Sequence, residues 1–128
     1  MLIPRSLLRI VDNSGAKLCR LIRVLSPSKK TKYGNLAVVS LKKVKPRKIH
    51  KGKKGEILKK GEIRLALIIY TKKSHFRKDG TMLKLSSNYG LLVTAKGKAI
   101  GSRYKTPLPK ELRTQKYAKL VSIAPSLF

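Results

Sequence analysis

Alternation of apolar and polar residues predicts a chain built mainly of short β-strands. The apolar runs are rich in Leu, Ile and Val and cover residues 6–11, 17–25, 35–44, 63–71, 82–85 and 90–95. Residues 12–15 and the pair Asp79-Gly80 are predicted turns, because Asn, Asp and Gly tolerate the left-handed backbone of tight turns. The pattern therefore predicts five or six short strands.

In three of these predicted strands the pattern also bears on which faces of the strand are buried. Residues 63–71 are almost wholly apolar except Arg64, which is typical of a central strand buried on both faces. Residues 35–44 break strict alternation, as a β-bulge would make them do. Residues 17–25 alternate cleanly, but Arg20 interrupts one face, so the pattern leaves open which face is the core.

After about residue 100 the pattern changes from strand to short helix. Pro107 and Pro109 disfavour strand pairing, and residues 110–113 suit one helical turn. Thr114 is expected to cap a second helix, which Pro125 would end. The apolar residues of that helix recur at helical spacing, at Tyr117, Val121 and Ala124, with Leu120 beside them.

These elements predict a mainly β fold in one domain, residues 1–128. The domain would consist of a small β-barrel over about residues 1–100 and a C-terminal lobe of short helices over about residues 101–128. A chain of 128 residues with 41% hydrophobic content is long enough to bury a modest core.

The formal net charge of +27 indicates a polyanionic partner. Five acidic residues cannot neutralise 32 basic ones, and the excess charge would repel itself in a compact protein. Nucleic acid is the partner that this charge favours, because the counterions released from it drive binding. An anionic membrane surface is the weaker alternative, since it would require a basic amphipathic helix.

Two basic segments lie inside the chain. Residues 42–60 hold nine lysines and Arg47 against one acid, and they predict a basic arm that extends from the folded body. Residues 72–78 contain His75 and Phe76, two rings able to stack on unpaired bases. The alternative for Phe76 is that its ring folds back onto the barrel.

The chain offers little for catalysis. His50 and His75 lie apart in the two basic segments, and together with the single Cys19 they give no metal-ligand spacing. Cys19 lies within a predicted strand, so we interpret it as a buried, inert thiol rather than a nucleophile. A single cysteine also allows no internal disulfide. We therefore expect no enzymatic activity, no cofactor and no metal site.

Short motifs occur in a fixed order: Asp12-Asn13-Ser14-Gly15-Ala16, Thr71-Lys72-Lys73, Arg77-x-Asp79-Gly80, Gly101-Ser102-Arg103, Glu111-Leu112-Arg113 and Ile123-Ala124-Pro125. Together they resemble the universal large-subunit ribosomal protein L-fourteen family over essentially the whole chain. Each motif alone is weak, but their order and spacing are highly specific. The resemblance implies a five-stranded β-barrel, a projecting basic β-ribbon at residues 42–60 and a C-terminal lobe with small helices.

The resemblance also implies a function. Members of the family are structural constituents of the large ribosomal subunit and bind its rRNA at the face that meets the small subunit. They help to form intersubunit bridges to small-subunit rRNA during translation, and they touch neighbouring large-subunit proteins. A ribosome-silencing factor docks near the segment that matches Gly101-Ser102-Arg103. No membrane partner is expected. Charge alone would equally fit a free-standing, non-specific RNA or single-strand nucleic-acid-binding protein, which is the competing hypothesis.

The candidate site residues follow from the basic segments and from the resemblance. The expected RNA-binding residues are Lys45, Arg47, Lys48, Lys51, Lys53, Lys54, Lys72, Lys73, Arg77, Lys78 and Arg103. The candidates for base stacking are His75 and Phe76. The candidates for contact with a partner protein or a bridge are Gly101, Ser102 and Arg103.

Two departures from the family pattern bear on the source of the chain. Tyr70 stands where bacterial members usually have arginine, and surplus residues lie between Arg47 and Lys59. The surplus, the high lysine content and an N-terminus that already looks like the first strand favour a mitochondrial, organelle-encoded member. A bacterial or plastid member is the alternative.

Overall fold

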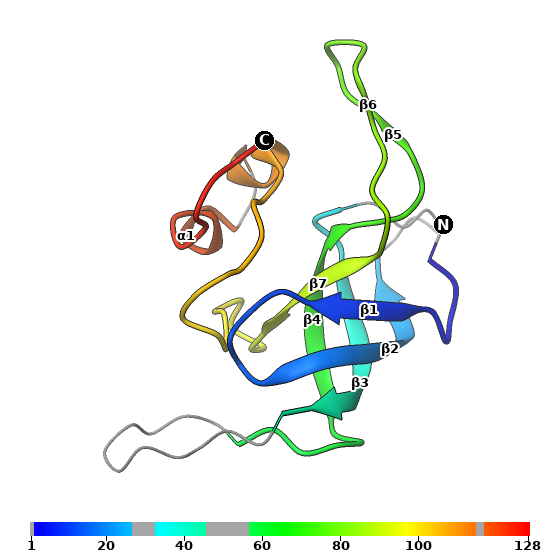
Figure 1. The fold of residues 1–128 in the computed structure, drawn as a ribbon, viewed down its shortest axis with the longest axis vertical. Helices are drawn as coiled ribbons and strands as arrows, with labels where there is room; N and C mark the ends of the chain where they lie inside the picture. The colour runs from blue at the N-terminus through cyan, green and yellow to red at the C-terminus, as the bar shows by residue number, and fades with distance from the viewer. Residues whose placement is uncertain (1, 27–32, 46–56, 115–116) are drawn as a thin grey trace.

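The computed structural model describes residues 2–26, 33–45, 57–114 and 117–128. Within these ranges five strands close into a barrel in the order β1-β2-β3-β4-β7 (Figure 1). The strands are β1 Leu7–Ile10, β2 Ala16–Leu25, β3 Leu36–Val44, β4 Ile63–Tyr70 and β7 Tyr89–Val93. β1 and β7 pair in parallel to close the barrel, and the other neighbours are antiparallel. The predicted five-stranded barrel is confirmed.

Bulges decide which residues of β2 and β3 face inward. Lys42 is an extra residue in β3, so the bulge predicted within residues 35–44 is confirmed. Ile22 is an extra residue in β2, between the paired positions Leu21 and Arg23. Because a bulge shifts the alternation, Leu21 is buried, Ile22 is exposed, and Val24 packs against the core again. This is why alternation in the sequence did not identify the core face of β2.

β4 lies between two apolar cores. Ala66 and Ile68 belong to the cluster inside the barrel, whereas Leu67 and Ile69 belong to a second cluster on the outside of the strand. The prediction of a strand buried on both faces is confirmed for this part of β4, although Ile63 at its start is 63% exposed. The second cluster also contains residues of the C-terminal lobe, including Leu108, Leu112, Leu120 and Val121.

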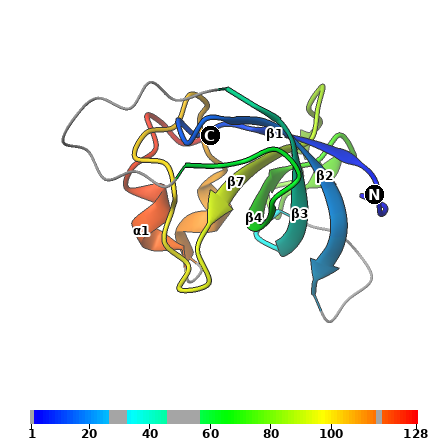
Figure 2. The ribbon, with the colours of Figure 1, turned by 90° about the horizontal axis from the view of Figure 1, so that it is seen from below.

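The C-terminal lobe contains the 3-10 helix η1 (Lys110–Thr114) and the α-helix α1 (Ala118–Val121). It packs on the outside of the barrel, next to β4 and β7 (Figure 2). The helical turn predicted at residues 110–113 is confirmed. The prediction for the second helix is wrong in its bounds: Thr114 ends η1, and α1 has Tyr117 at its N-cap and Ser122 at its C-cap. Leu120 and Val121, at the end of α1, are both buried in the second cluster.

A second sheet projects from the barrel (Figure 1). It is a hairpin of β5 (His75–Phe76) and β6 (Met82–Leu83), closed by the predicted turn at residues 79–80. Asp79 Oδ1 accepts hydrogen bonds from the backbone N–H and the hydroxyl of Thr81, and Gly80 has a φ of +83°. β5 was not predicted, because two residues are too few to show alternation.

Most of the predicted ribbon falls outside the described residues. Residues 46–56 are not described, and the part of residues 42–45 that is strand belongs to β3 and pairs with β2. On the other side, residues 57–60 form no strand. The predicted antiparallel pairing of residues 42–60 with each other is therefore not seen in the parts that the structure describes.

The turn after β1 joins the barrel to the segment that leads into the lobe. Asn13 Oδ1 accepts hydrogen bonds from the backbone N–H groups of Ser102 (2.9 Å) and Arg103 (3.3 Å), and Asn13 N–H donates to the Arg103 carbonyl (3.2 Å). Gly101 is buried directly beside this turn. Two motifs that lie about 90 residues apart in sequence thus form one contact.

Among the described residues, no helix is long and apolar enough to cross a membrane. Over the same part of the chain, no three His, Cys, Asp or Glu side chains gather where they could hold a metal ion.

Replacing Gly101 with alanine should destabilise the fold. A Cβ at residue 101 would lie 2.6 Å from Asp12 Cβ and 2.9 Å from Asn13 Oδ1, which is closer than such atoms can approach. We expect Gly101→Ala to lower the free energy of unfolding by about 1–3 kcal/mol, as overpacking of a full site does. Chemical denaturation measures it. Gly90→Ala is the matched control, because a Cβ there meets nothing closer than 3.4 Å; equal losses for both would contradict the close contact at Gly101.

Cys19 should be unreactive in the folded protein. Its side chain is fully buried, and burial raises the pKa of the thiol to about 12, with a smaller effect of the Asp12 carboxylate. Since the thiolate is the reactive form, iodoacetamide at mildly alkaline pH should label Cys19 only after unfolding in guanidinium chloride. The measurement is the mass of the labelled chain against time. Rapid labelling without denaturant would show that Cys19 is accessible and ionised.

Candidate nucleic-acid interface

Each acidic side chain of the described residues is buried or has a partner within the protein. Asp12 is buried, and the other three accept hydrogen bonds or form ion pairs: Glu62 with Arg64 (2.6 Å), Asp79 with Thr81, and Glu111 with Arg77 (2.7 Å). Burial raises the pKa of the Asp12 carboxyl, against the opposing effect of its hydrogen bonds with Ser14 and Leu92. Few acidic side chains within the described part of the protein are therefore left to pair with the exposed lysines, and the lysine charges face solvent.

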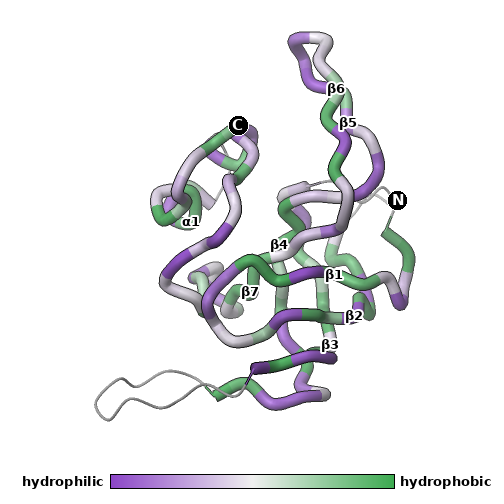
Figure 3. Tube along the Cα trace, viewed as in Figure 1, coloured by the Kyte–Doolittle hydropathy of each residue, from purple (hydrophilic) through white to green (hydrophobic). Residues whose placement is uncertain are grey.

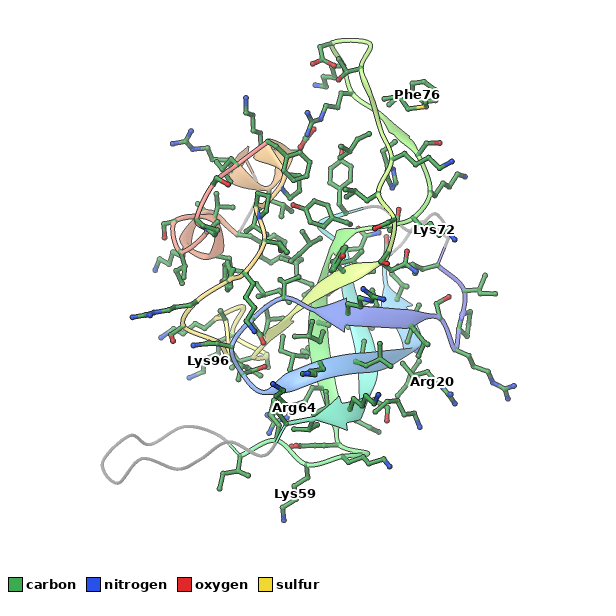
Figure 4. The ribbon with its side chains drawn as sticks, in the orientation of Figure 1. Arg20, Lys59, Arg64, Lys72, Phe76 and Lys96 are labelled. Atoms are coloured by element: carbon green, nitrogen blue, oxygen red, sulfur yellow. The ribbon has the colours of Figure 1, made fainter. Side chains whose placement is uncertain are left out.

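Basic side chains point outward on several sides of the molecule. Figure 4 shows Arg20, Lys59, Lys72 and Lys96 directed away from the ribbon in different directions. Figure 3 shows hydrophilic stretches along the barrel strands, the hairpin and the lobe alike. The geometry fits a partner that surrounds much of the protein better than a small ligand in a single pocket.

The β5-β6 hairpin presents lysines at its base and near its tip. Lys72, Lys73 and Lys78 are exposed. Lys72 N–H donates a 2.7 Å hydrogen bond to Asn88 Oδ1, so the chain entering the hairpin is fixed to the segment that leaves it. The three lysines, all predicted as RNA-binding residues, thus extend from a backbone that is anchored to the barrel.

Arg77 lies in a different environment from these lysines. Its Nε is 2.7 Å from Glu111 Oε1, its Nη2 donates to the Phe128 carbonyl (2.9 Å), and its guanidinium carbon lies 5.5 Å from the centre of the Phe128 ring. These contacts tie the hairpin to the C-terminal lobe. Arg77 was also predicted to bind RNA, and the structure shows that it already has three partners within the protein.

The two candidate stacking residues differ in exposure. The ring of His75 packs edge-on against Tyr33 with 5.3 Å between ring centres, and its Nε2 is hydrogen-bonded to the Thr71 hydroxyl. Phe76 is 75% exposed and points away from the barrel (Figure 4), so the alternative that it folds back is wrong. Met82, paired directly with Phe76 and 59% exposed, lies on the same face of the hairpin.

The segment from Gly101 to Arg103 is a fixed surface loop. Gly101 is buried, whereas Ser102 and Arg103 are exposed. Asn13 Nδ2 donates to the Ser102 hydroxyl (3.0 Å) in addition to the backbone bonds described above. Of the three residues predicted to meet a partner, only Ser102 and Arg103 therefore present side chains to solvent.

Of the RNA-binding residues predicted in the basic arm, the structure describes Lys45. Its predicted partners in RNA binding, Arg47, Lys48, Lys51, Lys53 and Lys54, lie outside the described residues. Lys45 is exposed, and its N–H donates to the Gly15 carbonyl (2.8 Å).

Sequence reasoning missed the lysines that surround Lys45. The Lys45 charge is the main cause that lowers the pKa of Lys17, with smaller contributions that include Lys105 and Lys43. Lys17, Lys43 and Lys105 were not predicted as site residues. Lys43 lies in the predicted basic segment beside Lys45, but no local signal could have added Lys17 and Lys105, since their proximity depends on how β2, β3 and the segment after Arg103 come together.

One comparison with known protein families bears on these observations. The family described as Ribosomal protein L14p/L23e matches residues 1–128. The match includes the barrel, the hairpin and the loop clamped by Asn13, and it agrees with the resemblance drawn from the ordered motifs. The chain therefore belongs to this family of structural proteins of the large ribosomal subunit.

Proposed function

We propose that the protein binds large-subunit rRNA at the face of the subunit that meets the small subunit, and that it contributes to intersubunit bridges during translation. The observation that supports this most strongly is the outward charge: the few described acids are buried or paired within the protein, while exposed lysines extend in several directions. Such a protein gains affinity from each phosphate that it neutralises.

The hairpin and the clamped loop have separate roles in this proposal. Lys72, Lys73 and Lys78 act as point charges toward rRNA phosphates, and Arg77 holds the hairpin against the lobe. Ser102 and Arg103 contact a bridge or a partner protein, either a neighbouring large-subunit protein or a ribosome-silencing factor. The fixed backbone of both elements would lower the entropy lost on binding.

For the compartment we propose the mitochondrial ribosome. The support is the surplus of residues between Arg47 and Lys59 and the excess of lysine over arginine. Immunodetection of the native protein in ribosomes from purified mitochondria would support it, and detection only in cytoplasmic or plastid ribosomes would exclude it.

Neutralising two hairpin lysines should weaken assembly into the large subunit. We expect wild-type protein to co-sediment with large subunits, and the double variant Lys72→Gln/Lys73→Gln to dissociate at lower salt, because it neutralises fewer phosphates. The measurement is the fraction bound after salt washes on a sucrose gradient. Lys110→Gln/Lys119→Gln removes the same charge from exposed sites in the C-terminal lobe and is the matched control. Wild-type protein at the top of the gradient would refute the ribosomal role.

Phe76 is expected to stack on an unpaired base. Phe76→Ala should weaken rRNA binding by about 1–3 kcal/mol, the usual contribution of base–aromatic stacking, and should leave stability unchanged because the ring is 75% exposed. Filter binding and thermal unfolding measure the two quantities.

Two further variants test whether the ring itself is responsible. Phe76→Tyr keeps the ring and should retain affinity, whereas Phe76→Leu keeps apolar surface and should lose it. Full affinity for Phe76→Leu would mean that Phe76 docks on an apolar surface and does not stack.

A further inference from the structure

Lysines from distant parts of the chain converge on the turn between β1 and β2. Lys45 is held by the hydrogen bond from its N–H to the Gly15 carbonyl (2.8 Å), and Lys105 by the bond from its N–H to the Val11 carbonyl (3.0 Å). Lys17 follows the turn in β2, and Lys43 lies on the neighbouring strand β3. All four side chains are exposed. We call this group the turn cluster.

A β-bulge places Lys17 in the turn cluster. Ala16 pairs with Val44 and Leu18 with Lys43, so Lys17 is an extra residue in β2 with no partner position in β3. Bulges re-aim side chains and are over-represented next to functional sites. Here the bulge keeps Ala16 buried in the core while Lys17 faces solvent beside the lysines of the neighbouring segments.

The turn cluster has no carboxylate to offset its charge among the described acids. Asp12, the acid of this turn, is buried, and its carboxylate oxygens accept hydrogen bonds from Ser14 and from the Leu92 N–H (3.3 Å). The Lys45 ammonium is the largest of several causes that lower the pKa of Lys17. The lysine side chains therefore repel one another in the free protein. A bound anion would offset this repulsion, because each ammonium group attracts it.

Backbone hydrogen bonds hold the segments of the cluster together in spite of that repulsion. The carbonyls of Val11 and Gly15 fix the backbones of Lys105 and Lys45, and Asn13 between them clamps residues 102 and 103. Several ammonium groups on one framework suit neighbouring phosphates of a nucleic-acid backbone, which lysine binds as a point charge.

We propose that Lys17, Lys43, Lys45 and Lys105 form a phosphate-binding site that receives the rRNA backbone at the turn between β1 and β2. The site is separate from the β5-β6 hairpin, and its assignment to rRNA rests on the function proposed above. It fixes the orientation of the barrel on the RNA, because contacts to phosphates position a protein on the nucleic acid and do not distinguish one base from another.

The first test measures RNA binding by the full-length chain as a function of salt, with rRNA extracted from large subunits as the probe. The double variant Lys17→Gln/Lys105→Gln should lower the slope of log affinity against log salt by about 0.7–0.9 for each phosphate that it no longer neutralises. Lys110→Gln/Lys119→Gln, equal in charge and located in the C-terminal lobe outside the cluster and the basic arm, should lower it less. The cluster variant should fold normally, since it removes like-charge repulsion. An unchanged slope for the cluster variant would overturn the proposal.

The second test uses inorganic tripolyphosphate and follows the lysine Cε resonances of the free protein by NMR. Resonances of the turn cluster should shift together, and the pKa of Lys17 should rise on addition of the anion, while Lys119 changes little. Absence of such shifts would overturn the site. If tripolyphosphate shifts them but wild-type protein does not bind rRNA, the site is one for small anions, and both the rRNA assignment and the proposed function are wrong.

Discussion

The buried carboxylate of Asp12 is the point at which the parts of this protein are joined. Its oxygens accept hydrogen bonds from Ser14 in the same turn and from Leu92 in β7, and its backbone forms a bridge with Tyr104. A buried charge is tolerated only when it has such partners. The turn, the barrel and the start of the C-terminal lobe therefore have to be formed together, and Gly101 leaves the space that this junction needs.

A protein with a net charge of +27 needs a core that resists the repulsion between its surface lysines. β4 supplies it, because one face of the strand packs inside the barrel and the other packs against the lobe. Tyr70, at the end of β4, extends the second core by stacking on Phe128 and donating its hydroxyl hydrogen to the Pro107 carbonyl. Burial raises the pKa of this hydroxyl, so it stays a neutral donor at physiological pH.

Two paired arginines and the exposed lysines have different physical roles. Arg64 and Arg77 pair with the acids Glu62 and Glu111 and stabilise the fold. Exposed lysines on the hairpin and around the turn after β1 are left for a polyanion. Arginine suits the first role because its planar guanidinium makes several directed hydrogen bonds at once, whereas lysine acts as a hydrated point charge.

By itself, the sequence determined the barrel strands, the turns at residues 12–15 and 79–80, the double-sided burial of β4 and the family, because these depend on local alternation, turn chemistry and motif order. The sequence also indicated the two basic segments. For Phe76 it left two alternatives, an exposed ring that stacks on a base and a ring that folds back onto the barrel. Only the tertiary structure decided the core face of β2, the early end of α1, the internal partners of Arg77 and the turn cluster around Lys17. The core face of β2 and the position of Lys17 depend on bulges, and the partners of Arg77 depend on contacts between segments far apart in the chain. Broken alternation can indicate that a bulge is present, as in residues 35–44, but contacts between distant segments leave no periodic signal in the sequence.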